Sequence, residues 1–309
     1  MSYIYFWRKI MPFTGLGTAV CTPFDDSDTF SYAAYEKLIE FQIENGADAI
    51  VTCGTTGEAS TISLEEHVEV VRAAVEISKK AGEKIGKKIP VVAGAGGNDT
   101  TDCCTLGNEC RKVGADALMY VAPYYNKPSQ RGLIAHYTKI AAEVDLPIVV
   151  YNIPGRTGIN IQPKTMETIS KIPNVVALKE ASGDFGQVAE IAERCGDKIA
   201  ILSGNDDYIV PILSLGGKGV ISTTGNILPR QLHDMVEKFL AGDVAASRKI
   251  QLEILPMVRL MFADVNPVPV KAALNLMGFA MGACRLPLAP IEDALLENLK
   301  TEMRRFNLI

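Results

Sequence analysis

The sequence predicts an α/β protein of the (β/α)8 TIM-barrel class with a C-terminal helical extension. Eight short apolar segments alternate with helical patterns, and polar alternation is missing from the apolar segments, as expected for parallel strands buried on both faces. No G-x-G-x-x-G motif follows the first segment, so a closed barrel is favoured over a doubly wound nucleotide-binding sheet. After about residue 242 only helical patterns punctuated by prolines remain.

The predicted strands are rich in Val, Ile and Ala, and small or polar residues follow each one. They cover residues 17–22, 48–54, 89–94, 115–123, 147–152, 174–180, 198–204 and 219–225. In a barrel the carboxyl ends of the strands and the loops after them form the active-site face. We therefore look for candidate catalytic residues at these strand ends.

Helical spacing of apolar residues fills the gaps between the strands. The pattern at 31–46 stops at Gly46, and the pattern at 63–82 begins with a capping-box pair, Ser63 and Glu66, and stops at Gly82. The other expected helices cover roughly 100–113, 129–143, 163–171, 185–195, 206–215, 229–241, 243–264, 268–280 and 290–306. We accordingly divide the chain into an N-terminal tail that can be disordered (1–11), a catalytic barrel (12–241) and an α-helical region (242–309).

Composition argues against several classes of protein. The 309 residues are 22% charged and 48% hydrophobic, which is ordinary for a globular enzyme. The net charge of -5 and the lack of any Lys/Arg run longer than a pair argue against nucleic-acid binding. No apolar stretch reaches the roughly 18 residues of a membrane span, and residues 1–10 lack the order of a signal peptide. We expect a cytoplasmic protein that binds neither membrane nor nucleic acid.

The cysteines predict neither a metal site nor a disulfide framework. Their number, 7, is odd, no C-x-x-C occurs, and Cys103 and Cys104 are adjacent. Reduced thiols in a cytosolic protein are the better interpretation.

Two strand-end motifs carry hydroxyl groups. CGTTGE follows the second strand, where backbone N–H groups and the hydroxyls of Thr55 and Thr56 suit a small carboxylate, although a glycine turn with helix-capping threonines explains the pattern equally well. PYYNKPSQ follows the fourth strand, and its Tyr124 and Tyr125 are suited either to the site or to packing at an interface.

Two further motifs carry proton-transfer and cationic groups. In YNIPGRTG, after the fifth strand, Tyr151 is placed to relay protons and Arg156 to bind a carboxylate in a bidentate manner. In ALKEASGD an apolar strand leads directly into Lys179. A desolvated lysine becomes an amine nucleophile for a carbonyl, whereas a lysine paired with Glu180 at the strand end would be structural.

The motifs GTTGE, PYYNKPSQ, YNIPGRTG and LKEASGD, in this order and spacing, resemble the dihydrodipicolinate synthase family of the pyruvate-dependent class I lyases. The resemblance extends from about residue 12 through GGKGVIS to the helical C-terminus. It implies condensation of pyruvate with L-aspartate 4-semialdehyde to 4-hydroxy-tetrahydrodipicolinate, the first committed step of lysine and diaminopimelate biosynthesis. No metal or organic cofactor is implied, because a protonated imine is itself the electron sink.

The resemblance assigns a role to each matching residue. Lys179 would form an imine with pyruvate, with Tyr151 beside it as proton relay. Thr55 would link Tyr151 to Tyr125, which in this family enters the neighbouring subunit's site, so a homo-oligomer is implied, either a dimer or a dimer of dimers. The remaining positions contact the substrates: Thr56 and Gly57 hold the pyruvate carboxylate, Arg156 binds the carboxylate of the second substrate, and Gly204 and Ile221 line the pocket.

Feedback inhibition by lysine is an open question for this sequence. Inhibited members of the family bind lysine at the dimer interface, and the matching residues here are Ala59, His67, Asn98, Asp102 and Tyr124. Asp102 is shorter than the usual Glu, and Leu64 replaces a histidine found in some inhibited members. For His67 and Asn98, helix-surface and loop-capping roles explain the residues as well as effector binding does.

Two alternative functions stay open. Lyases that act on N-acetylneuraminate or keto-deoxy sugar acids resemble the chain in fold, but they typically lack an arginine at the position of Arg156. A non-catalytic small-acid sensor on the same fold is the alternative from a different class. GTTGE rather than GSTGE, together with Arg156, favours the dihydrodipicolinate synthase branch.

Overall fold

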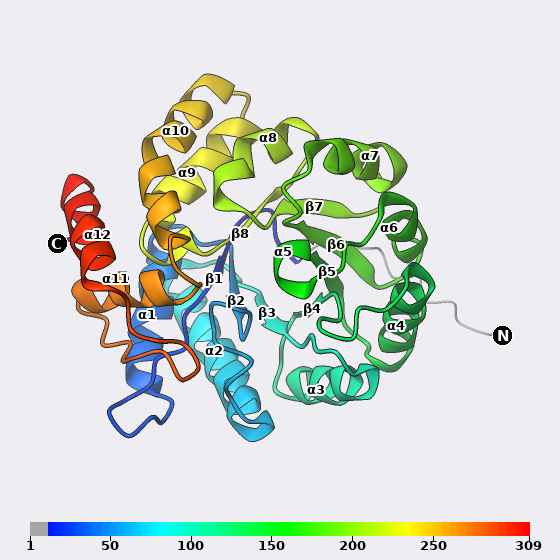
Figure 1. Ribbon diagram of the computed structural model, residues 1–309, viewed down its shortest axis with the longest axis horizontal. Coiled ribbons are helices and arrows are strands. Elements are labelled where there is room, and N and C mark those ends of the chain that lie inside the picture. The colour runs from blue at the N-terminus through cyan, green and yellow to red at the C-terminus, as the bar shows by residue number, and fades with distance from the viewer. Residues whose placement is uncertain (1–11) are drawn as a thin grey trace.

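The computed structural model describes residues 12–309 and has a closed barrel at its centre (Figure 1). The expected N-terminal tail lies outside the described residues. The strands are β1 Gly15–Ala19, β2 Ala49–Thr52, β3 Val91–Gly94, β4 Ala117–Val121, β5 Ile148–Asn152, β6 Val175–Glu180, β7 Ala200–Ser203 and β8 Gly219–Ser222. Each strand pairs in parallel with the next, and β8 pairs with β1. The predicted (β/α)8 barrel is confirmed.

Helices surround the barrel on its outside (Figure 1). They are α1 Tyr32–Glu44, α2 Leu64–Ile85, α3 Thr100–Lys112, α4 Gln130–Glu143, α6 Pro163–Ile169, α7 Phe185–Cys195, α8 Ile209–Ser214 and α9 Pro229–Leu240. Three short elements were not predicted separately, and they follow β5, β7 and β8: α5 Pro154–Thr157, η1 Asp206–Tyr208 and η2 Thr224–Asn226. They lie at the carboxyl ends of their strands, where they shape the loops of the barrel mouth.

The C-terminal extension packs on one side of the barrel (Figure 1). It consists of α10 Val244–Met261, α11 Val268–Leu276 and α12 Asp293–Arg305, as the proline-punctuated helical patterns predict. Lys37 on α1 donates a hydrogen bond to the carbonyl of Gly278 (2.9 Å), which ties the segment after α11 to the barrel helices. In the part of the chain that the structure describes, no helix combines the length and apolar character needed to cross a membrane.

Helix α2 ends later than the sequence pattern predicts. Its start is as expected, because the Ser63 side chain accepts a hydrogen bond from the Glu66 amide. Gly82, however, lies inside the helix, which ends at Gly86 with φ of 69°. A Cβ on Gly82 would lie 2.4 Å from the carbonyl oxygen of Lys87. The glycine therefore makes room for the returning chain, and the predicted stop was wrong.

Strand β1 is also displaced from its predicted bounds, 17–22. The chain leaves the sheet after Ala19 because the next residues bond to the loops of the barrel mouth. The amide of Cys21 donates to the Asn226 side chain (3.2 Å), and the Thr22 hydroxyl donates to the carbonyl of Gly57 (2.8 Å). These bonds connect the end of β1 with the loops after β2 and β8.

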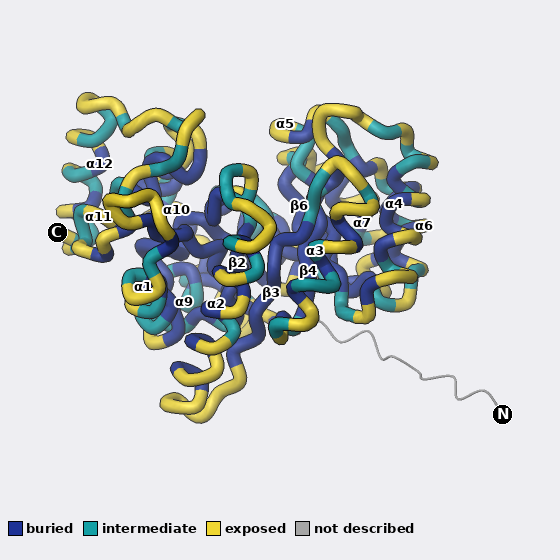
Figure 2. The backbone as a smooth tube through the Cα atoms, turned by 90° about the horizontal axis from the view of Figure 1, so that it is seen from below, coloured by how far each residue is buried: buried dark blue, intermediate teal, exposed yellow. Residues whose placement is uncertain are grey.

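Two apolar clusters position the strand ends. The larger cluster combines residues of the strands and the surrounding helices, and the smaller combines Phe13 with residues of the strands and their ends. Figure 2 shows the strands buried at the centre of the molecule. Phe13 belongs to the smaller cluster and packs so closely on Gly17 that an added Cβ would lie 2.6 Å from its ring. Tyr151 and Ile221 belong to the same cluster. This packing thus holds the Tyr151 ring in place at the carboxyl end of β5.

Candidate active site

Lys179 lies near the carboxyl end of β6 with only 7% of its surface exposed. It is in register with Tyr151 on β5, and its Nζ lies 4.2 Å from the centre of the Tyr151 ring. On the other side, a Cβ on Gly204 would lie 2.9 Å from the Cβ of Ala181 and 3.1 Å from Lys179 Cγ, so a side chain at position 204 would crowd both residues. The side chain is therefore held between β5 and the end of β7.

The competing interpretation of Lys179, an ion pair with Glu180, does not hold. Successive residues of a strand point to opposite faces, and Glu180 accepts hydrogen bonds from Asn152 Nδ2 (3.1 Å) and the Ser182 amide (2.6 Å). Within residues 12–309, no acidic side chain forms an ion pair with Lys179. The lysine is buried beside an aromatic face and keeps its amine available.

Burial changes the proton affinities of both residues. Desolvation, assisted by the positive charge of Arg156, lowers the pKa of Lys179 to about 8, although the carboxylate of Asp206 opposes this. At pH 7 about one tenth of such an amine is neutral, which is several hundred times the neutral fraction of an ordinary lysine. Desolvation also raises the pKa of Tyr151, so its phenol keeps its proton at neutral pH. A nucleophilic amine and a proton donor thus lie side by side.

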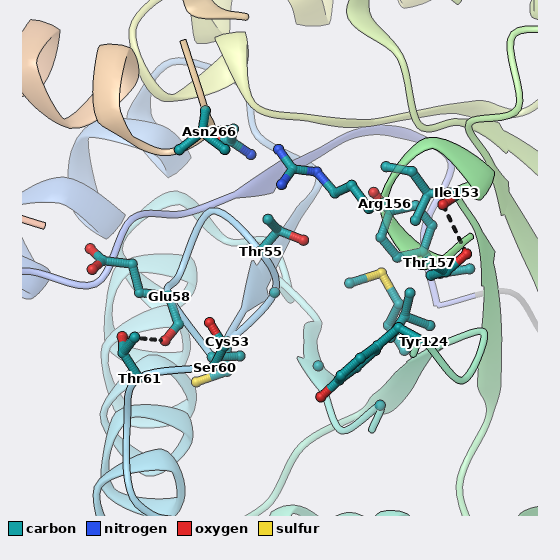
Figure 3. Close-up of a pocket in the computed structure, with 18 of the residues that line it drawn as sticks. Cys53, Thr55, Glu58, Ser60, Thr61, Tyr124, Ile153, Arg156, Thr157 and Asn266 are labelled. Atoms are coloured by element: carbon teal, nitrogen blue, oxygen red, sulfur yellow. Dashed lines mark hydrogen bonds between the residues drawn. The ribbon is translucent and has the colours of Figure 1, made fainter. Parts of the chain in front are cut away.

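A cavity of about 290 Å³ opens at the barrel mouth next to this pair (Figure 3). Five predicted residues line it: Thr55, Ala59, Tyr124, Tyr151 and Arg156. Arg156 comes from α5, and its guanidinium extends across the cavity towards Thr55 and Asn266 (Figure 3). Lys179 does not line the cavity itself, but it contacts the ring of Tyr151, which does. The cavity thus places a cation opposite the loop that was predicted to hold a carboxylate.

The loop after β2 places its two threonines differently. Thr55 is exposed, whereas Thr56 is buried and its hydroxyl lies 3.2 Å from that of Thr223. Asn266 Nδ2 donates to the same Thr56 oxygen (3.0 Å). A Cβ on Gly57 would lie 3.0 Å from the Cys53 nitrogen, so the turn requires a residue without a side chain there. The loop is therefore tightly folded, with Thr55 exposed at the cavity and the Thr56 hydroxyl buried against Thr223 and Asn266.

Tyr125 is not brought to its own chain's cavity. It is 87% exposed with φ of 69°, and it is not among the residues that line the cavity. In the described part of the chain, Thr55 forms no side-chain hydrogen bond with Tyr125 or Tyr151. Ile221 is buried with Tyr151 in the smaller apolar cluster. The predicted link between Thr55, Tyr151 and Tyr125 thus has only two of its members at this cavity.

The residues predicted for lysine binding are divided between two cavities. Ala59, His67 and Asp102 line a second cavity of about 370 Å³, and Tyr124 lines the first, which Ala59 also lines. Asn98 is exposed and its carbonyl accepts a hydrogen bond from Asn126. A ring nitrogen of the buried His67 lies 2.8 Å from the Gly94 carbonyl, and burial lowers the pKa of this histidine, so it is neutral at pH 7. His67 therefore has a structural contact, and the lysine site stays a prediction.

Two polar residues near the site were missed from the sequence. Asn266 lies just before α11, lines the cavity at the barrel mouth, and has a buried Oδ1 without a hydrogen-bond partner. Asp206 begins η1, is buried, and accepts a hydrogen bond from the Thr224 amide (2.7 Å). Asp206 closely follows β7, so the strand-end rule was sufficient to find it. Asn266 follows a helix, and no such rule points to it.

Comparison with known proteins places this geometry in a family. The model of the dihydrodipicolinate synthetase family matches residues 12–305. The chain belongs to this family. It is 50% identical over 298 residues to 4-hydroxy-tetrahydrodipicolinate synthase of Lachnoclostridium phytofermentans, which covers 96% of this chain and 99% of the relative. The predicted family, the lyase class and the synthase function are confirmed by full-length relatives of this kind.

Solved structures of the dihydrodipicolinate synthetase family superimpose closely on the chain. The dihydrodipicolinate synthase of Thermotoga maritima is 39% identical, with a TM-score of 0.92 over 97% of this chain and 100% of that one. The chloride-inhibited enzyme of Acinetobacter baumannii, solved in complex with pyruvate, is 36% identical, with a TM-score of 0.91 over 96% of this chain and 99% of that one.

Within the described residues, no group of three or more His, Cys, Asp or Glu side chains is placed to hold a metal ion.

Proposed function

We propose that the amine of Lys179 forms an imine with pyruvate and that the derived enamine attacks L-aspartate 4-semialdehyde. The observation that carries this proposal is a buried lysine without an acidic partner, whose pKa falls to about 8, against the phenol of Tyr151. The family relative solved with pyruvate supports the first substrate. Arg156, which extends over the cavity, supports an acidic second substrate (Figure 3).

The chemistry proceeds in four balanced steps. The neutral amine adds to the keto carbon of pyruvate, and the resulting hydroxyl takes up one proton from solvent and leaves as water, which gives a protonated imine. Loss of a methyl proton gives an enamine, whose methylene carbon attacks the aldehyde carbon while the aldehyde oxygen gains a proton. The neutral amino group of the second substrate then adds to the imine carbon and displaces the Lys179 nitrogen, which closes the ring and releases to solvent the proton taken up in the first step. The product is 4-hydroxy-tetrahydrodipicolinate, the first committed intermediate of lysine and diaminopimelate biosynthesis, and the free amine is restored.

The surrounding residues bind and move protons in these steps. Tyr151 is the proton donor and acceptor at the imine, because burial keeps its phenol protonated until a base removes the proton. Thr56 and Gly57 hold the pyruvate carboxylate, and Gly204 and Ile221 complete the wall. Arg156 binds the carboxylate of the second substrate.

We further propose that the active form is a homo-oligomer, a dimer or a dimer of dimers. Tyr125 is exposed and does not line its own chain's cavity, so a proton relay from Thr55 requires the Tyr125 of a second copy. Light scattering combined with Tyr125→Phe tests this, because a shared relay predicts lost turnover in an assembled enzyme. A fully active monomer would contradict the proposal.

The decisive test of the reaction is reductive trapping with borohydride in the presence of pyruvate. The wild-type protein should gain one covalent pyruvate adduct on Lys179, located by mass spectrometry, and Lys179→Ala should gain none. Turnover with aspartate semialdehyde should exceed turnover with sugar-derived aldehydes. A wild-type protein that cannot be trapped would rule out imine chemistry, and a preference for sugar aldehydes would favour a sugar-acid lyase.

A lysine-binding role for Ala59, His67, Asn98, Asp102 and Tyr124 is a separate proposal. Three of these residues line one cavity, and the Asp102 carboxylate there suits a cationic amine. Inhibition of turnover by millimolar lysine, relieved in Asp102→Asn, would support it.

A cytoplasmic location is supported by the seven free cysteines.

A further inference from the structure

A buried ion pair joins the loop after β2 to the C-terminal extension. Lys271 on α11 donates to Glu58 Oε1 at 2.7 Å, and both side chains are only 1% exposed. The same ammonium donates to the carbonyl of Ala283 (2.8 Å) and lies 4.3 Å from the centre of the Phe24 ring. The second Glu58 oxygen accepts a hydrogen bond from the Arg285 amide (2.8 Å). The Glu58 carboxylate is therefore bound entirely by groups of the extension, Lys271 and the Arg285 amide, and the Lys271 ammonium has Glu58, Ala283 and Phe24 as its neighbours.

Glu58 also closes the turn that carries the two threonines. Its amide donates to the Thr55 carbonyl (3.1 Å), and its own carbonyl accepts from the Thr61 amide (3.0 Å). Its φ of 54° lies in the left-handed region, which side chains other than glycine rarely adopt, so the residue is held there against a conformational cost. The side-chain anchor at Lys271 supplies the restraint that keeps the turn in this shape.

A second contact from the same segment reaches the same turn. Asn266, just before α11, donates to the Thr56 hydroxyl, while Lys271 within α11 holds Glu58. Figure 3 shows Glu58, Thr55 and Asn266 around the same end of the cavity. The α11 segment therefore forms hydrogen bonds with the turn at two residues, Thr56 and Glu58, one on each side of Gly57.

Stability alone is a poor explanation for this ion pair. Removing two charges from water is expensive, and apolar residues of similar volume usually stabilise a fold at least as well. The pair does, however, fix the direction of the chain at Glu58, which an apolar contact would do less precisely. The benefit therefore lies in geometry.

We propose that the Glu58–Lys271 pair is a positioning device that orients Thr55 and Thr56 towards pyruvate. Lys271 does not line the cavity and acts only through Glu58. The C-terminal extension would thus be required for the pyruvate site even though it contributes none of the predicted catalytic residues. This inference rests on the proposed function of the threonine loop.

The test compares neutral and charged versions of the pair. The double variant Glu58→Gln/Lys271→Met removes both charges together, so that no unpaired charge is left buried. Its KM for pyruvate should rise roughly tenfold or more, because small displacements of binding groups have large effects, while the KM for the aldehyde stays within about twofold. Lys271→Arg, which keeps the charge, should restore part of the affinity for pyruvate.

The matched control is Ser247→Ala, which removes a buried hydrogen bond from α10 of the extension to the Met235 carbonyl on α9 and leaves both contacts of the α11 segment with the turn in place. It should lower thermal stability without changing either KM. An unchanged KM for pyruvate in a folded double variant would overturn the proposal, and so would equal losses for both substrates. A double variant that cannot fold would show that the pair serves stability, which also overturns it. Failure of the wild-type protein to form the pyruvate adduct would instead contradict the proposed function.

Discussion

Lys179 and Lys271 are both buried, but their surroundings differ. Lys271 meets a carboxylate at 2.7 Å and a backbone carbonyl at 2.8 Å. Lys179 meets the face of Tyr151, and no acid pairs with it in the described chain. A buried ammonium without a partner is destabilised, so its pKa falls and the neutral amine becomes accessible. Burial with a partner produces a structural lysine, and burial without one produces a nucleophile.

The largest expected effect is the loss of the unpaired amine. Lys179→Arg keeps the positive charge and much of the volume, but its guanidinium cannot form the imine. We expect turnover to fall by at least roughly a thousandfold, with no borohydride-trapped adduct. Lys271→Arg is the matched substitution at the paired lysine and should retain the adduct. If Lys179→Arg still formed an adduct, the nucleophile would be a different amine.

The second effect concerns Arg156, whose positive charge acts on Lys179. Arg156→Ala should lower kcat/KM for aspartate semialdehyde by roughly a hundredfold, because a charge-assisted carboxylate contact is lost. Trapping by pyruvate alone should continue. Since the charge of Arg156 lowers the pKa of Lys179, the variant should also form the imine with its pH dependence shifted to higher pH. Equal damage to trapping and to turnover would show that Arg156 serves the first substrate.

The third effect is the pH dependence of the wild-type enzyme. The nucleophile is the neutral amine, so the rate of imine formation should rise with pH and level off above the Lys179 pKa of about 8. Trapping rates measured between pH 6 and pH 11 at fixed pyruvate would give the midpoint. A midpoint near the ordinary lysine value, about 10.5, would mean that the amine is hydrated and not buried.

The same contrast explains what the sequence predicted and what it did not. Lys179 and Tyr151 end apolar runs, and barrel geometry brings all such ends to one face, so local patterns were sufficient to name them as candidates, while the role of each came from the family resemblance. Lys271 on α11 and Asn266 just before α11 contact residues 213 and 210 positions away, and neither position follows a strand. Gly82 was misread because its purpose depends on the Lys87 carbonyl, which only the folded chain brings near. The position of Tyr125 in a shared site depends on a second chain and stays a prediction.

The smallest expected effect tests whether Lys179 is really unpaired. Asp206 is buried with one carboxylate oxygen lacking a partner, and its charge raises the pKa of Lys179 against the effect of burial. Asp206→Asn keeps the shape and removes the charge, so the pKa of Lys179 should fall further and the midpoint of trapping should move to lower pH. Asp207→Asn, at the adjacent position in η1, is the control and should leave the midpoint unchanged. If Asp206→Asn instead abolished trapping at every pH while the protein stayed folded, Asp206 would be a direct partner of the amine. The distinction between the two buried lysines would then be one of distance to the acid and not of its absence.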